Sequence, residues 1–168
     1  MSSLIHKKDT PSRLRIALIS VSTTRTKLSE DKSGTWIKKQ AKKNGHEVVI
    51  HQTVTDDIDA IQALLDHVVS KVSPHAVILS GGTGISPKDV TIEAVRPMFK
   101  KELTAFGPVF SQLSFEDIDS AAIMSRATAG IIENSIVFCL PGSLGACRLA
   151  CNQLIFPELG HLIKHMKE

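Results

Sequence analysis

Apolar residues follow two periodic patterns along this chain. Short, nearly continuous apolar runs at residues 14–21, 76–79 and 135–140 are typical of strands buried on both faces of a sheet. A looser alternation over residues 46–54 predicts one more strand. Between these runs, apolar residues recur at three- and four-residue spacing, as on one face of a helix. The alternation favours an α/β fold, with helices covering both faces of a mostly parallel sheet.

Helix boundaries can be placed from capping and breaking residues. Ser33 is positioned to cap a helix that runs to about Asn44, and Gly45 is positioned to end it. A helix that begins near Asp89 should stop before Pro97. The other helical segments are expected at residues 58–72, 109–113, 121–127, 144–154 and 159–166. The stretch from 106 to 130 is the hardest to interpret, because it gives only two short helical pieces.

Composition limits the class of protein. At 168 residues, 42% apolar and 22% charged, the chain fits one globular domain over residues 13–168, preceded by a flexible leader at 1–12. A net charge of +3 and seven aromatic residues other than histidine do not suggest a nucleic-acid binder. No apolar run reaches the roughly 18 residues that a membrane helix needs. Without the apolar segment of a signal peptide, the chain is expected in the cytoplasm.

Two pairs of residues at four-residue spacing were considered as metal or redox sites. Cys147 and Cys151 lack the two-residue gap of a zinc knuckle or redox motif, so both, with Cys139, are expected to be reduced, partly buried thiols. His161 and His165 share a helix face, but the segment between them lacks the glutamate of a metalloprotease. A solvated histidine pair is therefore expected.

The sharpest local signal follows the apolar run at 76–79. Ser80-Gly81-Gly82-Thr83-Gly84 places three glycines in four positions, which favours a tight turn against a bulky group. Consecutive amides in such a turn form an anion-binding concavity, and Thr83 adds a hydroxyl donor. A plain tight turn is the alternative interpretation. The spacing matches neither a Walker A loop nor the dinucleotide-binding fingerprint.

Acidic residues stand at two of the strand exits. Asp89 is either a helix N-cap or a ligand of Mg²⁺ beside a phosphate cradle, where Lys88 would contact a phosphate as a point charge. One of Asp56 and Asp57 is expected to cap the following helix. If the strands are neighbours, Asp56 and Asp89 project into one crevice. That arrangement suits metal-assisted phosphoryl or nucleotidyl transfer.

Two further polar residues have two interpretations each. Ser143, after Pro141 and Gly142, either caps a helix or contacts an anion. Arg126 could reach a phosphate or a neighbouring subunit, and the sequence leaves both open.

Four motifs, in this order, closely resemble the molybdenum cofactor biosynthesis protein B (MoaB/Mog) family. They are SGGTG at 80–84, KDVTIEA at 88–94, MSRATAG at 124–130 and LPGS at 140–143. The resemblance covers residues 13–166. It implies a three-layer α/β/α molybdopterin-binding fold and assembly into homotrimers or homohexamers. It also implies the adenylylation of molybdopterin with Mg·ATP, which releases pyrophosphate.

The resemblance also implies roles for individual residues. Asp56 and Asp89 would occupy the two functionally important aspartate positions, with Asp89 near the Mg²⁺ ion. The residues expected to bind the pterin phosphate and the nucleotide are Ser80, Gly81, Gly82, Thr83, Gly84, Lys88 and Ser143.

Three departures from the family pattern bear on catalysis. Thr23 replaces the aspartate of Ser-Asp-Thr-Arg-Thr, and residues 106–111 lack the glutamate and arginine of Gly-Phe-Gly-Glu-Leu-Phe-Arg. Lys88 replaces an arginine, which is a milder change. Losing charged groups near a metal–phosphate site weakens substrate orientation. The alternatives are therefore a non-catalytic molybdopterin carrier or an interaction scaffold with a vestigial pocket.

Overall fold

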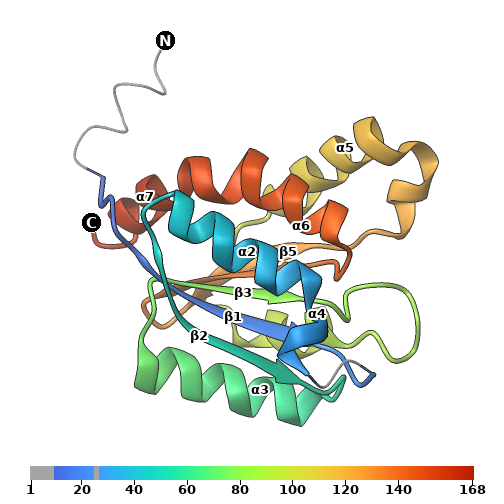
Figure 1. Ribbon diagram of the computed structural model, residues 1–168, viewed down its shortest axis with the longest axis horizontal. Coiled ribbons are helices and arrows are strands. Elements are labelled where there is room, and N and C mark those ends of the chain that lie inside the picture. Colours follow the sequence, from blue (N-terminus) through green and yellow to red (C-terminus); the bar gives the residue numbers. More distant parts are fainter. Residues whose placement is uncertain (1–9, 25–26) are drawn as a thin grey trace.

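A computed structural model describes residues 10–24 and 27–168. Its six strands form one sheet in the order β2-β1-β3-β6-β5-β4 (Figure 1). Strands β1, β2, β3 and β6 are mutually parallel, whereas β5 pairs antiparallel with both β6 and β4. Their bounds are β1 Arg15–Val21, β2 Glu47–Val54, β3 Ala76–Ser80, β4 Lys101–Glu102, β5 Thr128–Ile132 and β6 Ser135–Leu140. The expected mostly parallel sheet is confirmed.

Helices cover both faces of this sheet. Along β1, Ile16 and Leu18 join the core cluster on one face, while Ala17 and Ile19 join the cluster on the other. Helices α2, α5, α6 and α7 pack on the first face, and α3 and α4 on the second (Figure 1). The helices are α2 Lys32–Lys43, α3 Ile58–His67, α4 Thr91–Val95, α5 Phe106–Ile118, α6 Leu144–Ala150 and α7 Phe156–His165. The three-layer α/β/α prediction is therefore confirmed.

Shorter helical segments connect these elements. The 3-10 segments are η1 Leu28–Glu30, η3 Arg96–Met98 and η4 Asp119–Met124, and the π-helical segments are η2 Val68–Val72 and η5 Cys151–Ile155. Segment η5 makes the helix expected at 144–154 continue directly into α7. In the part of the chain that is described, no helix is long and apolar enough to cross a membrane.

Several local expectations were wrong. Asp31, not Ser33, caps α2, because its Oδ1 accepts a hydrogen bond of 2.8 Å from the amide of Gly34. By contrast, α4 ends at Val95, before Pro97 as expected, and the chain continues as the 3-10 segment η3, whose first turn tolerates Pro97 because no amide donor is needed there. Only η4 occupies part of the helix expected at 121–127, and β4 and β5 were not expected. Of the leader expected at 1–12, residues 1–9 lie outside the described residues.

All three cysteines are free and fully buried. Burial raises the pKa of the Cys139 and Cys151 thiols, so neither forms a thiolate near neutral pH. Cys147 donates a hydrogen bond of 3.3 Å to the carbonyl of Pro141. The cysteines form no disulfide, as expected, but they are fully buried and not partly buried.

Candidate active site

A hollow of about 410 Å³ lies at the carboxyl ends of the parallel strands. In open α/β sheets, ligands bind in this region where the strand order reverses, which here lies between β1 and β3. We call it the glycine-turn hollow, after the turn formed by residues 81–84. Its lining residues are Val21, Ser22, Asp56, Gly81, Gly82, Thr83, Gly84, Asp89, Met124, Ser125, Pro141, Gly142 and Ser143. The structure thus brings both predicted aspartates and the glycine turn together.

The glycine turn has a backbone that only glycine adopts easily. Gly81 and Gly82 have φ angles of 102° and 64°, in the left-handed region. A Cβ atom on Gly81 would lie 2.3 Å from the carbonyl oxygen of Val21. The amide of Gly81 donates to the carbonyl of Leu140, which ties the turn to the end of β6. The turn therefore lies directly against β1 and β6.

Three carbonyl groups of the glycine turn accept hydrogen bonds from fixed donors. Those of residues 81 and 82 accept hydrogen bonds from the hydroxyl and amide of Thr91, at 2.8 and 2.9 Å, and that of Thr83 accepts from Arg126 Nε at 2.9 Å. All peptide bonds in the described chain are trans, so each following N–H points the opposite way. Within residues 10–24 and 27–168, the N–H groups of residues 82–84 have no acceptor. Three consecutive free amides form a site for an anion.

One carboxylate oxygen of Asp56 accepts hydrogen bonds from the protein, and the other is available to a ligand. Its Oδ2 accepts hydrogen bonds from the amide and the hydroxyl of Thr23, at 2.7 and 2.8 Å. Its Oδ1 lies 3.0 Å from where a Cβ on Gly82 would be, and it has no hydrogen-bond donor among the described residues. The neighbouring Asp57 caps α3 by accepting from the amide of Ala60 at 2.8 Å. Asp56 is therefore the member of the pair that lines the hollow.

Asp89 has a similar arrangement. Its Oδ2 accepts from the amide of Ser86 at 2.9 Å, and its Oδ1 has no donor in the described part of the chain. Helix α4 begins at Thr91 after Val90, so the interpretation of Asp89 as its N-cap was wrong. A Cβ on Gly84 would lie 2.7 Å from Asp89 Oδ2, which explains why glycine stands there.

The two carboxylates provide a donor set that Mg²⁺ accepts. Mg²⁺ is usually held by one or two carboxylates, with substrate phosphates and water completing its shell. Asp56 Oδ1 and Asp89 Oδ1 both remain available beside the free amides. In the described ranges, no group of three or more His, Cys, Asp or Glu side chains is arranged to hold a metal ion. The hollow therefore fits a metal that arrives with a phosphate-containing substrate.

Arg126 fixes the glycine turn through a hydrogen bond to the carbonyl of Thr83. Besides Thr83, it contacts both oxygens of Glu93, at 2.7 and 3.3 Å. The hydrogen bond to Arg126 lowers the pKa of Glu93, and the same bond raises the pKa of Arg126, so both stay charged. Arg126 thus links the glycine turn, α4 and the segment before β5. Its guanidinium is already hydrogen-bonded within the chain. Neither contact with a phosphate nor contact with a neighbouring subunit is therefore needed to explain this arginine.

Of the other predicted site residues, Ser143 lines the glycine-turn hollow, whereas Ser80 and Lys88 do not. Ser143 lines the hollow and also caps α6, because its Oγ accepts from the amide of Ala146 at 3.2 Å. Ser33 donates to the carbonyl of Gly142 at 2.9 Å and fixes this loop. Ser80 is buried at the end of β3 and lines a separate, smaller hollow. Lys88 is exposed and does not line the glycine-turn hollow.

Sequence reasoning missed several residues of the site. Thr23 was noted only as a departure from the family pattern, yet it contributes two hydrogen bonds to Asp56. Thr91 is fully buried and holds two carbonyls, a role that its place in the motif at 88–94 did not indicate. Met124 and Ser125 line the hollow from the end of η4. Arg25 and Thr26, which follow Thr23 in the segment compared with Ser-Asp-Thr-Arg-Thr, lie outside the described residues.

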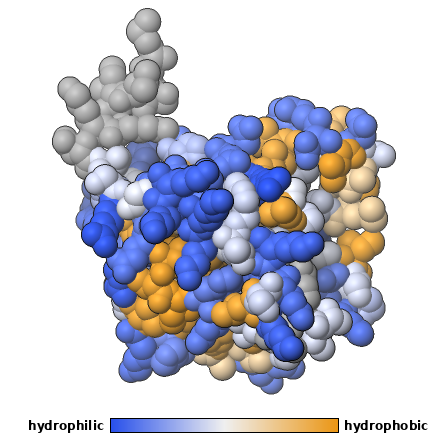
Figure 2. All heavy atoms as spheres, in the orientation of Figure 1, coloured by the Kyte–Doolittle hydropathy of each residue, from blue (hydrophilic) through white to orange (hydrophobic). Residues whose placement is uncertain are grey.

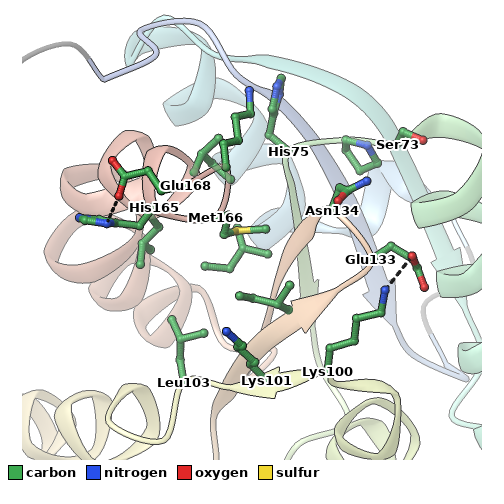
Figure 3. A pocket seen from close by; sticks show the side chains of 16 residues that line it. Ser73, His75, Lys100, Lys101, Leu103, Glu133, Asn134, His165, Met166 and Glu168 are labelled. Carbon is green, nitrogen blue, oxygen red and sulfur yellow. Dashed lines mark hydrogen bonds and ion pairs between the residues drawn. The ribbon is translucent and has the colours of Figure 1, made fainter.

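A larger cavity, of about 760 Å³, lies at the opposite end of the strands (Figure 3). Its walls are the turn between β5 and β6, the residues before β3 and the C-terminal part of α7. Lys100 forms an ion pair of 2.9 Å with Glu133 at its edge. None of the predicted site residues lines this cavity.

The sequence and the fold are similar to those of known proteins. Residues 17–161 match the family described as "Probable molybdopterin binding domain". The chain is 46% identical to Molybdenum cofactor biosynthesis protein B of Bacillus subtilis, over 100% of this chain and 99% of that protein. It is 38% identical to Molybdopterin adenylyltransferase of Pyrococcus furiosus, over 97% of each chain. A crystal structure of Molybdenum cofactor biosynthesis protein B is similar, with a TM-score of 0.90, 42% identity and coverage of 94% and 98%.

Proposed function

Since the chain belongs to the family of probable molybdopterin-binding domains, we propose that it catalyses the Mg-ATP-dependent adenylylation of molybdopterin. The relative from Pyrococcus furiosus carries the name of that activity. The observation that carries the proposal is a row of three free amides beside two carboxylates, all in the glycine-turn hollow. Each carboxylate has one oxygen bound by the protein and one oxygen without a donor among the described residues. An anion site next to a metal-binding pair is what a nucleotidyl transfer needs.

The reaction joins two anions, and the residues of the hollow counter their repulsion. A terminal phosphate oxygen of molybdopterin attacks the α-phosphorus of ATP, the bond from that phosphorus to the bridging oxygen breaks, and pyrophosphate leaves. The amides of residues 82–84 bind phosphate oxygens, and Lys88 contributes a positive charge from the same loop. Alignment by these fixed groups supplies much of the acceleration.

Asp56 and Asp89 are the residues that would hold Mg²⁺ in this scheme. When bound there, Mg²⁺ neutralises charge on the triphosphate and on the pyrophosphate that leaves. Thr23 keeps the Asp56 carboxylate oriented through two hydrogen bonds to a single oxygen. Ser86 does the same for Asp89 through its amide. Each carboxylate therefore presents one oxygen without having to reorganise.

A carrier that binds molybdopterin without adenylylating it is the second candidate. It is favoured by Thr23, which stands where the family pattern has an aspartate, and by the uncharged Pro108 and Ser111 in α5. Purified protein incubated with molybdopterin and Mg·ATP distinguishes the two. Pyrophosphate release in proportion to adenylylated product supports the enzyme. Tight pterin binding without pyrophosphate release supports the carrier and contradicts the enzyme.

We also propose that the chain assembles into a homotrimer or homohexamer. Large apolar side chains gather on the lobe formed by α5 and η4 (Figure 2). Ile123 is 89% exposed and Phe115 is 58% exposed. Contiguous exposed apolar surface of this kind marks an interaction site. The lobe adjoins the glycine-turn hollow through Met124, so an assembled partner would stand beside the site.

A cytoplasmic location is proposed on two grounds. The three cysteines of the chain are all free, as is usual where thiols are kept reduced. The proposed reaction also needs ATP.

A further inference from the structure

Two histidine side chains meet on the surface of α7. His161 and His165 stand one helical turn apart, and their Nε2 atoms are 2.9 Å from each other. The ring centroids are 4.6 Å apart and the ring planes make an angle of 63°. The side chain of His161 is 27% exposed and that of His165 is 58% exposed. The solvated pair expected from the sequence is therefore a pair in direct contact.

A carboxylate lies beside the Nδ1 atom of each ring. His161 Nδ1 lies 3.3 Å from Glu158 Oε2, and His165 Nδ1 lies 2.9 Å from Glu168 Oε2. Figure 3 shows the contact between His165 and Glu168. An ionised carboxylate only accepts hydrogen bonds, so these contacts favour the tautomer with the proton on Nδ1. In the neutral form of each ring, Nε2 then bears a lone pair.

Two lone pairs at this separation repel each other unless a cation lies between them or one ring carries its proton on Nε2 and donates it to the other. A cation placed there would be either one extra proton shared by the rings or a metal ion that both nitrogens coordinate. With metal–nitrogen bonds of about 2.0 Å, a right-angled arrangement puts the nitrogens about 2.8 Å apart, whereas a tetrahedral one puts them about 3.3 Å apart. The observed 2.9 Å matches the right-angled arrangement.

We propose that His161 and His165 form a surface binding site for a divalent ion of tetragonal preference, Cu²⁺ first and Ni²⁺ second. Square-planar and tetragonal sites with nitrogen and oxygen ligands are typical of these two ions, and Cu²⁺ binds most tightly in the divalent series. Water completes the coordination, because the pair is exposed and no third protein ligand is arranged around it among the described residues.

The surroundings of the pair support a cation. Metal-bound histidines usually donate their other N–H to a carboxylate, which is the part that Glu158 and Glu168 play here. His165 is the last residue of α7, and the negative end of a helix dipole favours positive charge. The site lies on α7, away from the residues that line the glycine-turn hollow. It is therefore independent of the proposed adenylylation.

The test uses the full chain without an affinity tag, stripped of metal by a chelator that is then removed. Cu²⁺ is titrated in a weakly competing glycine buffer and followed by electron paramagnetic resonance. We expect one strong equivalent with a tetragonal spectrum and hyperfine structure from two nitrogens. His161→Gln and His165→Gln should each weaken binding about 10-fold or more, because a single imidazole loses the chelate. Ni²⁺ should bind less tightly, and Zn²⁺ should not bind more tightly than Cu²⁺.

Two histidine controls make the result specific. His67→Gln removes an exposed histidine on α3, and His6→Gln removes the one in the segment outside the described residues. Both should bind Cu²⁺ as the parent chain does. Equal Cu²⁺ affinity in all four variants would overturn the proposal, as would binding only at millimolar concentrations, which would mean that the rings share a proton alone. Pyrophosphate release by the His161 and His165 variants should be unchanged, so this test is separate from that of the proposed function.

Discussion

Each carboxylate in the glycine-turn hollow uses one oxygen for the protein and keeps one for a ligand. For Asp56 the protein partner is Thr23, and for Asp89 it is the amide of Ser86. A carboxylate held in this way has already lost the rotational freedom that ligand binding would otherwise remove. The chemistry proposed for the hollow therefore depends on the second oxygen of each residue, which a small change can test.

Asp89→Asn should lower the rate of adenylylation by about 10²-fold or more, the scale of losing one preorganised electrostatic group. Asparagine keeps the shape of the side chain and an oxygen that can accept from Ser86, but it removes the charge that would hold Mg²⁺. Pyrophosphate release at saturating Mg·ATP measures the effect. Asp57→Asn, which alters only the cap of α3, is the matched control. Unaltered turnover of the Asp89 variant would contradict the assigned role.

Arg126→Lys should lower kcat/KM for Mg·ATP by about 10-fold while the chain stays folded. Lysine has one nitrogen, so it cannot contact both oxygens of Glu93 and the carbonyl of Thr83 at once. The glycine turn would therefore lose a hydrogen bond that fixes it. Steady-state kinetics and circular dichroism together check this. Arg96→Lys changes a comparable arginine–glutamate pair, with Glu102, and should leave kcat/KM near the native value. Equal losses in both variants would point to a general effect on stability.

At the scale of elements, the sequence predicted the four parallel strands because three are distinct apolar runs and β2 shows a looser alternation. It missed β5, whose sequence TAGII contains a glycine in its centre and gives no clear alternation. The turn from β5 to β6 places Glu133 at a φ of 50°, a conformation that glutamate rarely adopts and that no sequence rule would suggest. Strand β4 has only two residues, which is too short for any periodicity.

The start of α2 shows why a local capping rule chose the wrong residue. Ser33 fits the rule, but the structure uses Asp31, whose carboxylate also accepts hydrogen bonds from Ser20 on β1 and contacts His51 on β2 at 2.9 Å. Both partners are distant in sequence, so their contribution cannot be deduced from the helix alone. Burial raises the pKa of Asp31, but the hydrogen bonds from His51, Ser20 and Gly34 outweigh it and lower the pKa to about 2.

This lowered pKa predicts how stability responds to acid. A carboxyl whose folded pKa lies below its unfolded value of 3.8 stabilises the fold above that value, and the contribution is lost as the pH falls towards 2. The contribution is on the order of 2 kcal/mol. Urea unfolding between pH 5 and pH 3 should therefore show a stability difference between the native chain and Asp31→Asn that narrows on acidification. A constant difference across this range would contradict the assigned network.

At the scale of the whole molecule, the candidate site is a product of sheet topology. Asp56 and Asp89 follow different strands, and they share a hollow because β2, β1 and β3 are consecutive neighbours that end at one edge. The sequence predicted which residues stand at strand ends, and hence most of the lining. It could not predict the strand order, which decides whether those ends meet, or the contact between Thr23 and Asp56.

The exposed lobe of α5 and η4 makes assembly testable at the same scale. Ile123→Asp places a charge on a residue that is 89% exposed, so the fold should persist while subunit contacts fail. Light scattering coupled to gel filtration should give a trimer or hexamer for the native chain and a smaller mass for the variant. Ile58→Asp changes an exposed isoleucine at the start of α3 and should keep the native mass. A native chain that is monomeric would contradict the proposed assembly.

The deep burial of all three thiols gives the molecule a built-in reporter of unfolding. Cys139, Cys147 and Cys151 belong to β6, α6 and η5, so a disulfide reagent can reach them only when this part of the core opens. We expect native protein to resist labelling by such a reagent and to release all three thiols together once denaturant opens the chain. The labelling rate would then follow opening of the core without any added probe.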